Sequence, residues 1–358
     1  MSDSKATKRD KNIAVFFGGC STEYEVSLQS ACSVIQNINP EKYSVILIGI
    51  DRNTGKWFWY QGSIEDIALD RWQTKENCRP VFPSLDRTVH GICYAEGTEI
   101  KTISLSGALP ILHGKNGEDG TLQGLLELMG VPVIGCGLLS SALCMDKDLA
   151  HQIVRMGGIK AARSAVLEDS RQIEEKEDIW EKAREIGYPL FVKPVRSGSS
   201  FGITKVQSKE QLIPAIWEAF QHDSTVILEE MIEGFEVGCA VLGTSEPVIG
   251  EVDEIELSDG FFDFTEKYTL KTSSIHVPAR ITAEKAEEIK ETALQIYRLL
   301  RCSGFARVDM FLTPEGEIYF NEVNTIPGFT SHSRYPNMLK EAGLSFAEVI
   351  ERLLGQGV

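Results

Sequence analysis

The sequence predicts an α/β protein of several domains that opens with a Rossmann-like domain, and three observations support this prediction. The chain has 358 residues, whereas a single domain usually has roughly 150. Hydrophobic residues make up 42% of the chain and charged residues 25%, as in ordinary globular proteins. Residues 11–50 show a strand pattern, a glycine turn, a helix pattern and a second strand pattern, which is how a parallel α/β sheet begins.

The first predicted strand, Lys11–Phe17, is rich in apolar residues and ends at Gly18-Gly19. Ser21 and Thr22 follow the glycines, and these residue types are typical of a helix N-cap. The helix that follows places three apolar side chains on one face, namely Leu28, Cys32 and Ile35. A second apolar strand is predicted at Ser44–Ile50.

The remaining elements of the first domain surround a glycine-rich turn. A third strand, Ala108–Leu112, leads into the turn His113–Gly120, whose sequence is HGKNGEDG. A helix is predicted to begin at Thr121, and a strand at Val131–Ile134 follows it. We place this Rossmann-like domain at residues 1–138.

After about Ser140 the predicted elements are those of a small α+β domain, which we place at residues 139–229. Helices are predicted at Met145–Met156 and Lys209–Phe220, and strands at Tyr188–Lys193, Ile203–Val206 and Val226–Glu230. A loop rich in glycine and serine, Ser197–Gly202, joins the first two strands.

The last part of the chain, residues 230–358, combines strands with one amphipathic helix. The strands are predicted at Glu236–Leu242, Pro247–Ile255, Phe305–Leu312 and Ile318–Val323. The last two form a hairpin. Apolar side chains recur every three or four residues between Glu284 and Leu300, which predicts a helix with one buried face. A long polar loop, residues 258–278, lies before this helix.

Charge and composition argue against several classes of partner. The chain has 36 Lys and Arg against 52 Asp and Glu, a net charge of −16 that repels nucleic acid phosphates. No apolar run approaches the roughly 18 residues of a membrane span. Residues 1–10 are polar and rich in lysine, so we expect a disordered leader and not a secretory signal. These features predict a cytoplasmic protein that binds neither nucleic acid nor membrane.

The eight cysteines form no C-x-x-C pair and do not cluster with histidine. Several lie within apolar runs, as Cys239 does in EVGCAVLG. We therefore expect reduced, mostly buried thiols and no zinc site.

The predicted hairpin carries the strongest local signal for chemistry. Alternate residues of a strand share a face, so Arg307 lies on the same face as Asp309, and Glu322 on the same face as Asn324. Two carboxylates and an amide oxygen are ligands suited to magnesium that is held together with substrate phosphates. On the pattern alone, a solvated hairpin face with an Arg–Asp ion pair explains these residues equally well.

A second signal is Lys193, which lies near the end of a strand and before the loop Arg196–Gly202. The loop amides and the lysine charge could hold phosphate oxygens, although an ordinary flexible loop would show the same composition. The chain has no G-x-x-x-x-G-K-[ST] sequence. Gly135-Cys-Gly137 also lacks the third glycine and the later acidic residue of a dinucleotide site, which argues against an oxidoreductase.

Taken in order, the motifs resemble those of an ATP-grasp enzyme of the D-alanine–D-alanine ligase family. They are GGCSTEYEVSL (18–28), LHGKNGEDGTLQG (112–124), LFVKP with GSSFG (190–202), LEEMIEGFEVG (228–238), GFARVDMF (304–311) and EIYFNEVNTIPGFTSHSRYP (317–336). They cover nearly the whole chain after the leader. The resemblance implies a two-lobed ATP-grasp fold after the Rossmann-like domain.

The resemblance also implies an ATP site. Lys147 and Lys193 resemble the two lysines that hold the ATP phosphates. The hinge segment that faces adenine corresponds to Glu229, Glu230, Met231 and Ile232. Glu236 resembles the carboxylate on the ribose hydroxyls, and Lys267 would reach the γ-phosphate from a lid formed by the 258–278 loop.

The resemblance also implies which residues bind metal and which take part in catalysis. Asp309, Glu322 and Asn324 resemble the ligands of two magnesium ions, which Mn²⁺ could replace, with Glu322 bridging the pair. Arg307 and the backbone amide of Gly328 would stabilise the transferring phosphoryl group and the tetrahedral oxyanion.

Further residues resemble those that bind the first D-amino acid. Glu23 resembles the acceptor of its ammonium group, and Ser199 and Tyr268 would join Glu23 when the lid closes. His113 lies in a family motif and is expected to have a supporting role only.

The family implies an acyl phosphate made from D-alanine and ATP, and three second substrates are known for it: D-alanine, D-lactate and D-serine. Glu266-Lys267-Tyr268 is intact, which argues against D-lactate. Ser333 is followed by Arg334, where ordinary D-alanine ligases have leucine, and an arginine could donate to a D-serine hydroxyl. Phe262 and Asp253 are further candidates for this pocket.

The segment around Arg334 resembles the D-alanine–D-serine ligases of vancomycin resistance of the VanG type. We therefore expect a homodimeric ligase that uses D-alanine and D-serine. Three alternatives stay open: a D-alanine–D-alanine ligase of ordinary cell-wall synthesis, another ATP-grasp ligase, and a two-lobed binding protein without activity. A further alternative for Arg334 is that it is a surface or ion-pairing residue without a selective role.

Overall fold

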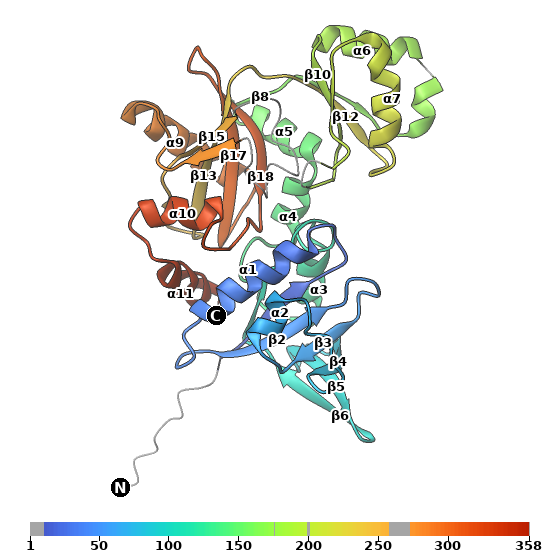
Figure 1. The fold of residues 1–358 in the computed structure, drawn as a ribbon. Coiled ribbons are helices and arrows are strands. Elements are labelled where there is room, and N and C mark those ends of the chain that lie inside the picture. Colours follow the sequence, from blue (N-terminus) through green and yellow to red (C-terminus); the bar gives the residue numbers. More distant parts are fainter. Residues whose placement is uncertain (1–10, 175, 199–200, 258–272, 358) are drawn as a thin grey trace.

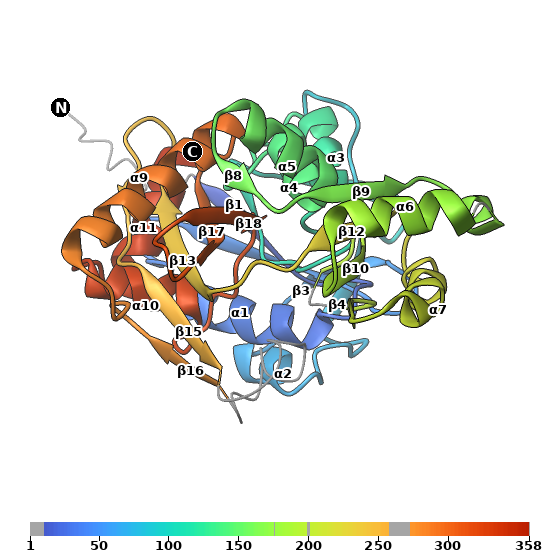
Figure 2. The ribbon, with the colours of Figure 1, turned by 90° about the horizontal axis from the view of Figure 1, so that it is seen from above.

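The computed structural model describes residues 11–174, 176–198, 201–257 and 273–357 (Figure 1). Three sheets form the framework of this part of the chain. Figures 1 and 2 show the central and C-terminal lobes side by side, with the N-terminal domain packed beneath them. No helix among the described residues is both long and apolar enough to span a bilayer.

The N-terminal sheet has the strand order β6-β5-β4-β3-β2-β1-β7. Its strands are β1 (Asn12–Gly18), β2 (Ser44–Ile50), β3 (Trp57–Tyr60), β4 (Cys78–Pro83), β5 (Gly91–Glu96), β6 (Glu99–Ser104) and β7 (Gly107–Pro110). The helices are α1 (Tyr24–Asn37), α2 (Ile64–Ala68), α3 (Thr121–Met129) and α4 (Leu138–Met145). The predicted parallel opening is confirmed, because β1 pairs in parallel with both β2 and β7. The antiparallel strands β3 to β6 were not predicted.

Two local predictions in this domain are wrong. The N-cap of α1 is Glu23 and not Ser21 or Thr22, and the hydroxyl of Ser21 instead donates to the carbonyl of His113 at 2.6 Å. The segment Val131–Ile134 forms only an isolated bridge from Val133 to Ala108. Proline at position 132 has no N–H, so a ladder of hydrogen bonds cannot continue through it.

The central lobe contains the sheet β11-β10-β12-β9, in which every pair is antiparallel. Its elements are β9 (Ser164–Leu167), α6 (Lys176–Ile186), β10 (Leu190–Pro194), β11 (Thr204–Val206), α7 (Lys209–Ala219) and β12 (Val226–Glu230), with a short 3₁₀ helix at Ser170–Glu174. The helix predicted at Met145–Met156 is confirmed from Lys147 onward, whereas Met145 is the last residue of α4. Asp146 is extended there and separates α4 from α5 (Lys147–Met156), and its side chain caps α5 by accepting the N–H of Leu149 at 3.0 Å.

The C-terminal sheet has the order β16-β15-β13-β17-β18-β8, and β14 also pairs with β13. The strands are β8 (Lys160–Ala161), β13 (Phe235–Leu242), β14 (Val248–Ile249), β15 (Asp253–Leu257), β16 (Ser273–His276), β17 (Phe305–Leu312) and β18 (Ile318–Asn324). The helices are α9 (Ala283–Leu299), α10 (Arg334–Glu341) and α11 (Phe346–Gly357). The predicted β17–β18 hairpin is confirmed. The strand predicted at Pro247–Ile255 is interrupted, because the N–H of Glu251 donates to Met338 of α10 and not to a neighbouring strand.

One hydrophobic core is shared by the N-terminal domain and the C-terminal lobe. It contains Phe17 and Leu28 from β1 and α1 together with Phe329, Met338 and Leu353 from the end of the chain. Burial of this shared surface fixes the start of α1 relative to the segment after β18. All eight cysteines are free thiols and six of them are buried, which confirms the expected thiol state.

Candidate active site

A cavity of about 560 Å³ opens where the N-terminal domain, α5 and the C-terminal lobe meet. It is lined by many of the residues predicted from the sequence, among them Glu23, Lys147, Arg307, Glu322, Asn324, Gly328, Ser333 and Arg334. These residues come from positions far apart along the chain, so only the tertiary structure brings them together. Ser199, Phe262, Lys267 and Tyr268 lie outside the described residues.

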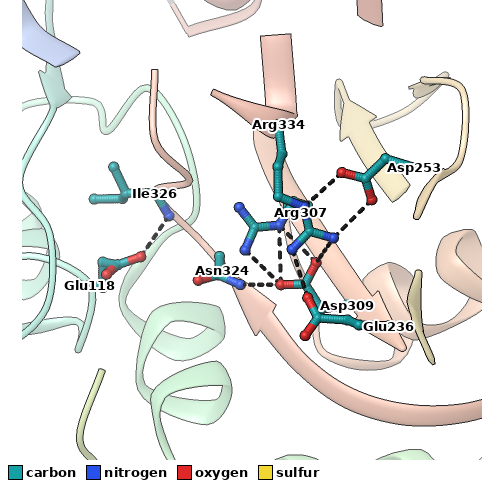
Figure 3. Close-up of polar contacts among 8 residues, drawn as sticks. All are labelled: Glu118, Glu236, Asp253, Arg307, Asp309, Asn324, Ile326 and Arg334. Atoms are coloured by element: carbon teal, nitrogen blue, oxygen red, sulfur yellow. Dashed lines mark hydrogen bonds and ion pairs between the residues drawn. The ribbon is translucent and has the colours of Figure 1, made fainter. Parts of the chain in front are cut away.

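The β17–β18 hairpin places four polar side chains on one face, as predicted. Asp309 lies opposite Glu322, and Arg307 lies opposite Asn324. Arg307 donates to Asp309 from Nε at 2.7 Å and from Nη2 at 2.6 Å, and the amide of Asn324 donates to Asp309 at 2.8 Å (Figure 3). The Asp309 side chain is only 1% exposed, so the ion pair is buried and the solvated hairpin face is excluded.

Arg334, the first residue of α10, also reaches this cluster. Its Nε and Nη2 donate to the two oxygens of Asp253 at 2.6 and 2.8 Å, and its Nη1 donates to Glu236 at 2.7 Å (Figure 3). Nη2 lies 3.4 Å from Asp309. Arg334 therefore has ion-pair partners within the protein itself. Asp253, itself 0% exposed, is an anchor for Arg334.

The two predicted phosphate lysines have different environments. Lys193 Nζ lies 2.6 Å from Glu229, and both side chains are buried. Burial alone raises the pKa of Glu229, but the hydrogen bond from Lys193 and the positive charges of Lys193, His151 and Lys147 together outweigh this effect, and the net pKa is lowered. Lys147 Nζ donates to the carbonyl of Ser197 at 2.7 Å, which ties α5 to the start of the glycine and serine loop.

Glu23 lies at the start of α1 between two glycines. A Cβ added at Gly114 would lie 2.5 Å from Glu23 Oε2, and one at Gly198 would lie 3.1 Å from it. Gly114 also has a positive φ of 69°, a conformation that side chains disfavour. The backbone at Gly114 and at Gly198 can therefore closely approach the carboxylate that is predicted to receive the substrate ammonium.

Two residues were not singled out from the sequence: Glu118, which lines the cavity, and Ser30, which lies behind His113 of the cavity wall. Glu118 is the glutamate of the GEDG motif. Glu118 accepts the N–H groups of Gly114 and Ile326. Burial and the neighbouring charge of Glu23 raise the pKa of Glu118 to about 8. Ser30 contacts His113 and accepts the N–H of Phe329.

Comparison with known proteins identifies the family of this chain. Residues 12–136 match the family model of the D-ala D-ala ligase N-terminus, and residues 153–355 match that of the D-ala D-ala ligase C-terminus. The chain belongs to the D-alanine–D-alanine ligase family. It is therefore an ATP-dependent D-alanine–D-X ligase, where X is the second substrate.

Individual relatives are similar over almost their full length. The Vancomycin C-type resistance protein VanC1 of Enterococcus gallinarum is 46% identical, over 96% of this chain and 97% of the relative. A D-alanine–D-alanine ligase of Caldicellulosiruptor bescii is 43% identical, over 97% and 94%. The crystal structure of the VanG D-Ala:D-Ser ligase from Enterococcus faecalis is 56% identical, with a TM-score of 0.90, and covers 98% of this chain and 100% of that one.

The residues around Glu229 fit the ATP used by the family. Glu229 Oε2 is buried and has no hydrogen-bond partner among the described residues. An unpaired buried acceptor is costly, and the exocyclic amino group of adenine is a donor of the kind that it lacks. Lys147 and Lys193 supply the positive charge that phosphates need.

The hairpin fits the magnesium of the family. Two carboxylates directly opposite each other in a sheet repel, and Asp309 and Glu322 are such a pair. Because Asn324 uses its amide nitrogen on Asp309, its side-chain oxygen is the atom left to bind a cation. Magnesium bound by Asp309, Glu322 and Asn324 would offset the charge of the carboxylates and the phosphates together.

Proposed function

We propose that this ligase joins D-alanine to D-serine through a D-alanyl phosphate, with two magnesium ions at the hairpin. The observation that carries the choice of D-serine is Arg334, a guanidinium in the cavity wall next to Ser333. A leucine at this position would present an apolar surface suited to the methyl group of D-alanine. The similarity to the VanG D-Ala:D-Ser ligase supports the same choice.

Arg334 would select D-serine as a donor that is already fixed in position by its ion pairs. Asp253 and Glu236 hold the guanidinium in place, so it needs no substrate to satisfy its charge. An arginine has five N–H groups, and the hydrogen bonds to Asp253 and Glu236 account for three. A fixed donor in the cavity favours a substrate hydroxyl because little side-chain freedom is lost when the bond forms.

The first step activates the carboxylate of D-alanine. A carboxylate oxygen attacks the γ-phosphorus of ATP, the new O–P bond forms, and ADP leaves. Glu23 receives the ammonium of D-alanine, and Lys147 and Lys193 hold the phosphates in line with the carboxylate. Asp309, Glu322 and Asn324 would hold magnesium, which would neutralise the negative charge that otherwise keeps the reactants apart.

The second step forms the peptide bond. The amine of D-serine attacks the acyl carbon, the C–N bond forms, the bond from carbon to the phosphate oxygen breaks, and the amine loses a proton. Arg307 and the amide of Gly328 stabilise the negative oxygen of the tetrahedral intermediate. No side chain of the protein becomes covalently attached.

This function implies a wider role. We infer a cytoplasmic homodimer that supplies modified peptidoglycan precursors and contributes to vancomycin resistance. The names of the relatives support the last point, since VanC1 is a vancomycin resistance protein.

Product analysis tests the assignment. The enzyme is given ATP, D-alanine and equal amounts of D-serine and D-lactate, and D-alanyl-D-serine is expected as the main product. A dominant D-alanyl-D-alanine product would contradict the choice of D-serine and leave the ligase itself intact.

Substitution of Arg334 tests the selective residue. Leucine alone would leave Asp253 buried and unpaired, so Arg334→Leu is also combined with Asp253→Asn. A hydrogen bond to a charged donor contributes about 1.5–3 kcal/mol, so the ratio of kcat/KM for D-serine over D-alanine should fall by about 10- to 100-fold. Arg280→Leu, which removes an arginine paired with Glu254 and Glu256 outside the cavity, should leave the ratio unchanged. An unchanged ratio in both Arg334 variants would remove Arg334 from selectivity.

A further inference from the structure

The backbone that follows β18, residues 325–330, is held by side chains of the N-terminal domain. Glu118 Oε1 accepts the N–H of Ile326 at 3.1 Å (Figure 3). Its other oxygen accepts the N–H of Gly114 at 2.7 Å. His113 Nδ1 lies 2.8 Å from the carbonyl oxygen of Ile326. Both backbone polar groups of Ile326 are therefore bound by the HGKNGEDG turn, more than 200 residues away in the sequence.

A third side chain extends this network to Phe329. Ser30 Oγ in α1 accepts the N–H of Phe329 at 3.2 Å and lies 3.2 Å from His113 Nε2. A carbonyl can only accept, so His113 Nδ1 donates to Ile326, and Nε2 of the neutral ring accepts from the Ser30 hydroxyl. Burial lowers the pKa of His113, which keeps the ring in this neutral form.

Gly328 lies between these two anchored residues. Ile326 is fixed on one side of it and Phe329 on the other, and the Phe329 ring is 1% exposed and packs on Tyr335 at 5.2 Å between ring centroids. A Cβ at position 328 would lie 3.0 Å from Ser333 Oγ, so the backbone here closely approaches the second-substrate segment. Anchors on both sides leave the Gly328 amide little freedom to change direction.

The contact between the two domains does not depend on these three side chains alone. The N-terminal domain and the C-terminal lobe already share a large buried core, in which α1 packs near α11. The hydrogen bonds of Glu118, His113 and Ser30 instead converge on two residues that flank one backbone amide. An oxyanion donor must be directed to within a few tenths of an ångström, and a surrounding set of hydrogen bonds is how proteins achieve this.

We propose that Glu118, His113 and Ser30 are positioning residues that aim the Gly328 amide at the tetrahedral oxyanion. This inference rests on the role proposed above for Gly328. It also gives the HGKNGEDG motif a function in the second chemical step, across the domain boundary from the residues that bind ATP.

The test compares two substitutions in the same turn. Glu118→Gln keeps one acceptor oxygen but places an NH₂ group where a second N–H points, so one of the two hydrogen bonds is lost. Asp119→Asn is the matched control, because Asp119 accepts N–H groups from its own neighbourhood in the chain, those of Asn116 and Thr121. Steady-state rates of dipeptide formation are measured with saturating D-alanine and D-serine, and thermal midpoints are recorded for each variant.

Glu118→Gln should lower kcat by about 10- to 100-fold and leave the KM for ATP within about twofold of the wild type, since an oxyanion donor acts in the transition state. Asp119→Asn should keep the wild-type kcat. Ser30→Ala should lower kcat as well, and the double variant should lose less than the product of the two single losses, because both act on the same amide.

Two results would overturn the proposal. One is a wild-type kcat in Glu118→Gln while the wild-type enzyme makes dipeptide normally. The other is a kcat loss that only follows a lower content of folded protein and is matched by Asp119→Asn. If the wild-type enzyme makes no dipeptide, the ligation assigned above fails, and the role of Gly328 on which this inference rests fails with it.

Discussion

Asp309 is the residue on which the chemistry of the hairpin converges. Arg307, Arg334 and the Asn324 amide all direct donors at a carboxylate that is 1% exposed (Figure 3). Burial alone lowers the pKa of Arg307, but the charge and hydrogen bonds of Asp309, together with the charge of Asp253, outweigh this effect and raise the pKa. Glu322 is the direct cross-strand neighbour of Asp309 and lines the cavity, so it is the carboxylate best placed to bind the metal and the phosphates together.

At this scale, we predict that Glu322→Gln abolishes ligation while the protein stays folded. The amide preserves the size of the side chain but removes the negative charge that magnesium requires. A dipeptide assay and a thermal unfolding curve are the measurements. Glu315→Gln, at an exposed position of the hairpin turn, is the control and should be fully active. Near-normal turnover of Glu322→Gln would exclude Glu322 as a metal ligand.

At the scale of single elements, α5 shows how a helix end places a functional side chain. Asp146 caps the helix, and Lys147, its first residue, reaches across to Ser197. The helix also packs against β18, so its position is set relative to the metal hairpin. Loss of the cap is therefore expected to move the lysine as well as weaken the helix.

We predict that Asp146→Ala lowers the free energy of unfolding by about 1 kcal/mol and raises the KM for ATP. Thr282→Ala is the matched control, since Thr282 caps α9 in the same way, through the N–H of Lys285. Its stability loss should be similar, with no change in the KM for ATP. If both variants alter the KM equally, the effect comes from general destabilisation and not from the placement of Lys147.

The whole molecule is an assembly of lobes that meet at the cavity, and Glu118 lies at one of these junctions. Its carboxylate bonds to the N-terminal domain and to the C-terminal lobe at once. Because its pKa is raised to about 8, the folded protein binds a proton here that the unfolded chain has already released. The contribution of Glu118 to the free energy of unfolding therefore decreases as the pH rises from about 4.5 to about 8.

We predict that the thermal midpoint of the wild type, measured relative to that of Glu118→Gln, falls as the pH is raised through this window and is constant above about pH 9. Unfolding curves of both proteins at pH 5, 6.5, 8 and 9 provide the comparison. Asp119→Asn keeps Glu118, so its midpoint relative to that of Glu118→Gln should change with pH as the wild-type midpoint does. A midpoint difference that does not vary with pH would show that Glu118 has an ordinary pKa.

Much of the fold could be predicted because local patterns report local structure. β1, β2, the antiparallel hairpin and α9 were found from apolar periodicity and glycine positions, since a strand or helix places its apolar residues at a fixed period. The errors lie where one residue interrupts a pattern, as Pro132 does in the segment Val131–Ile134. The meander β3 to β6 has many partly exposed residues and gave no such period.

The sequence by itself determined the family, the ATP and metal residues as candidates, and the common face of Arg307, Asp309, Glu322 and Asn324. Only the tertiary structure decided which side chains and backbone groups these residues and their neighbours contact. Asp253 pairs with Arg334 and Glu118 binds Ile326 across 81 and 208 residues, respectively. Periodicity shows which way a side chain faces along its own element, but the partner on the opposing element depends on how the sheets and helices pack, because hydrogen bonds and ion pairs act only over short distances.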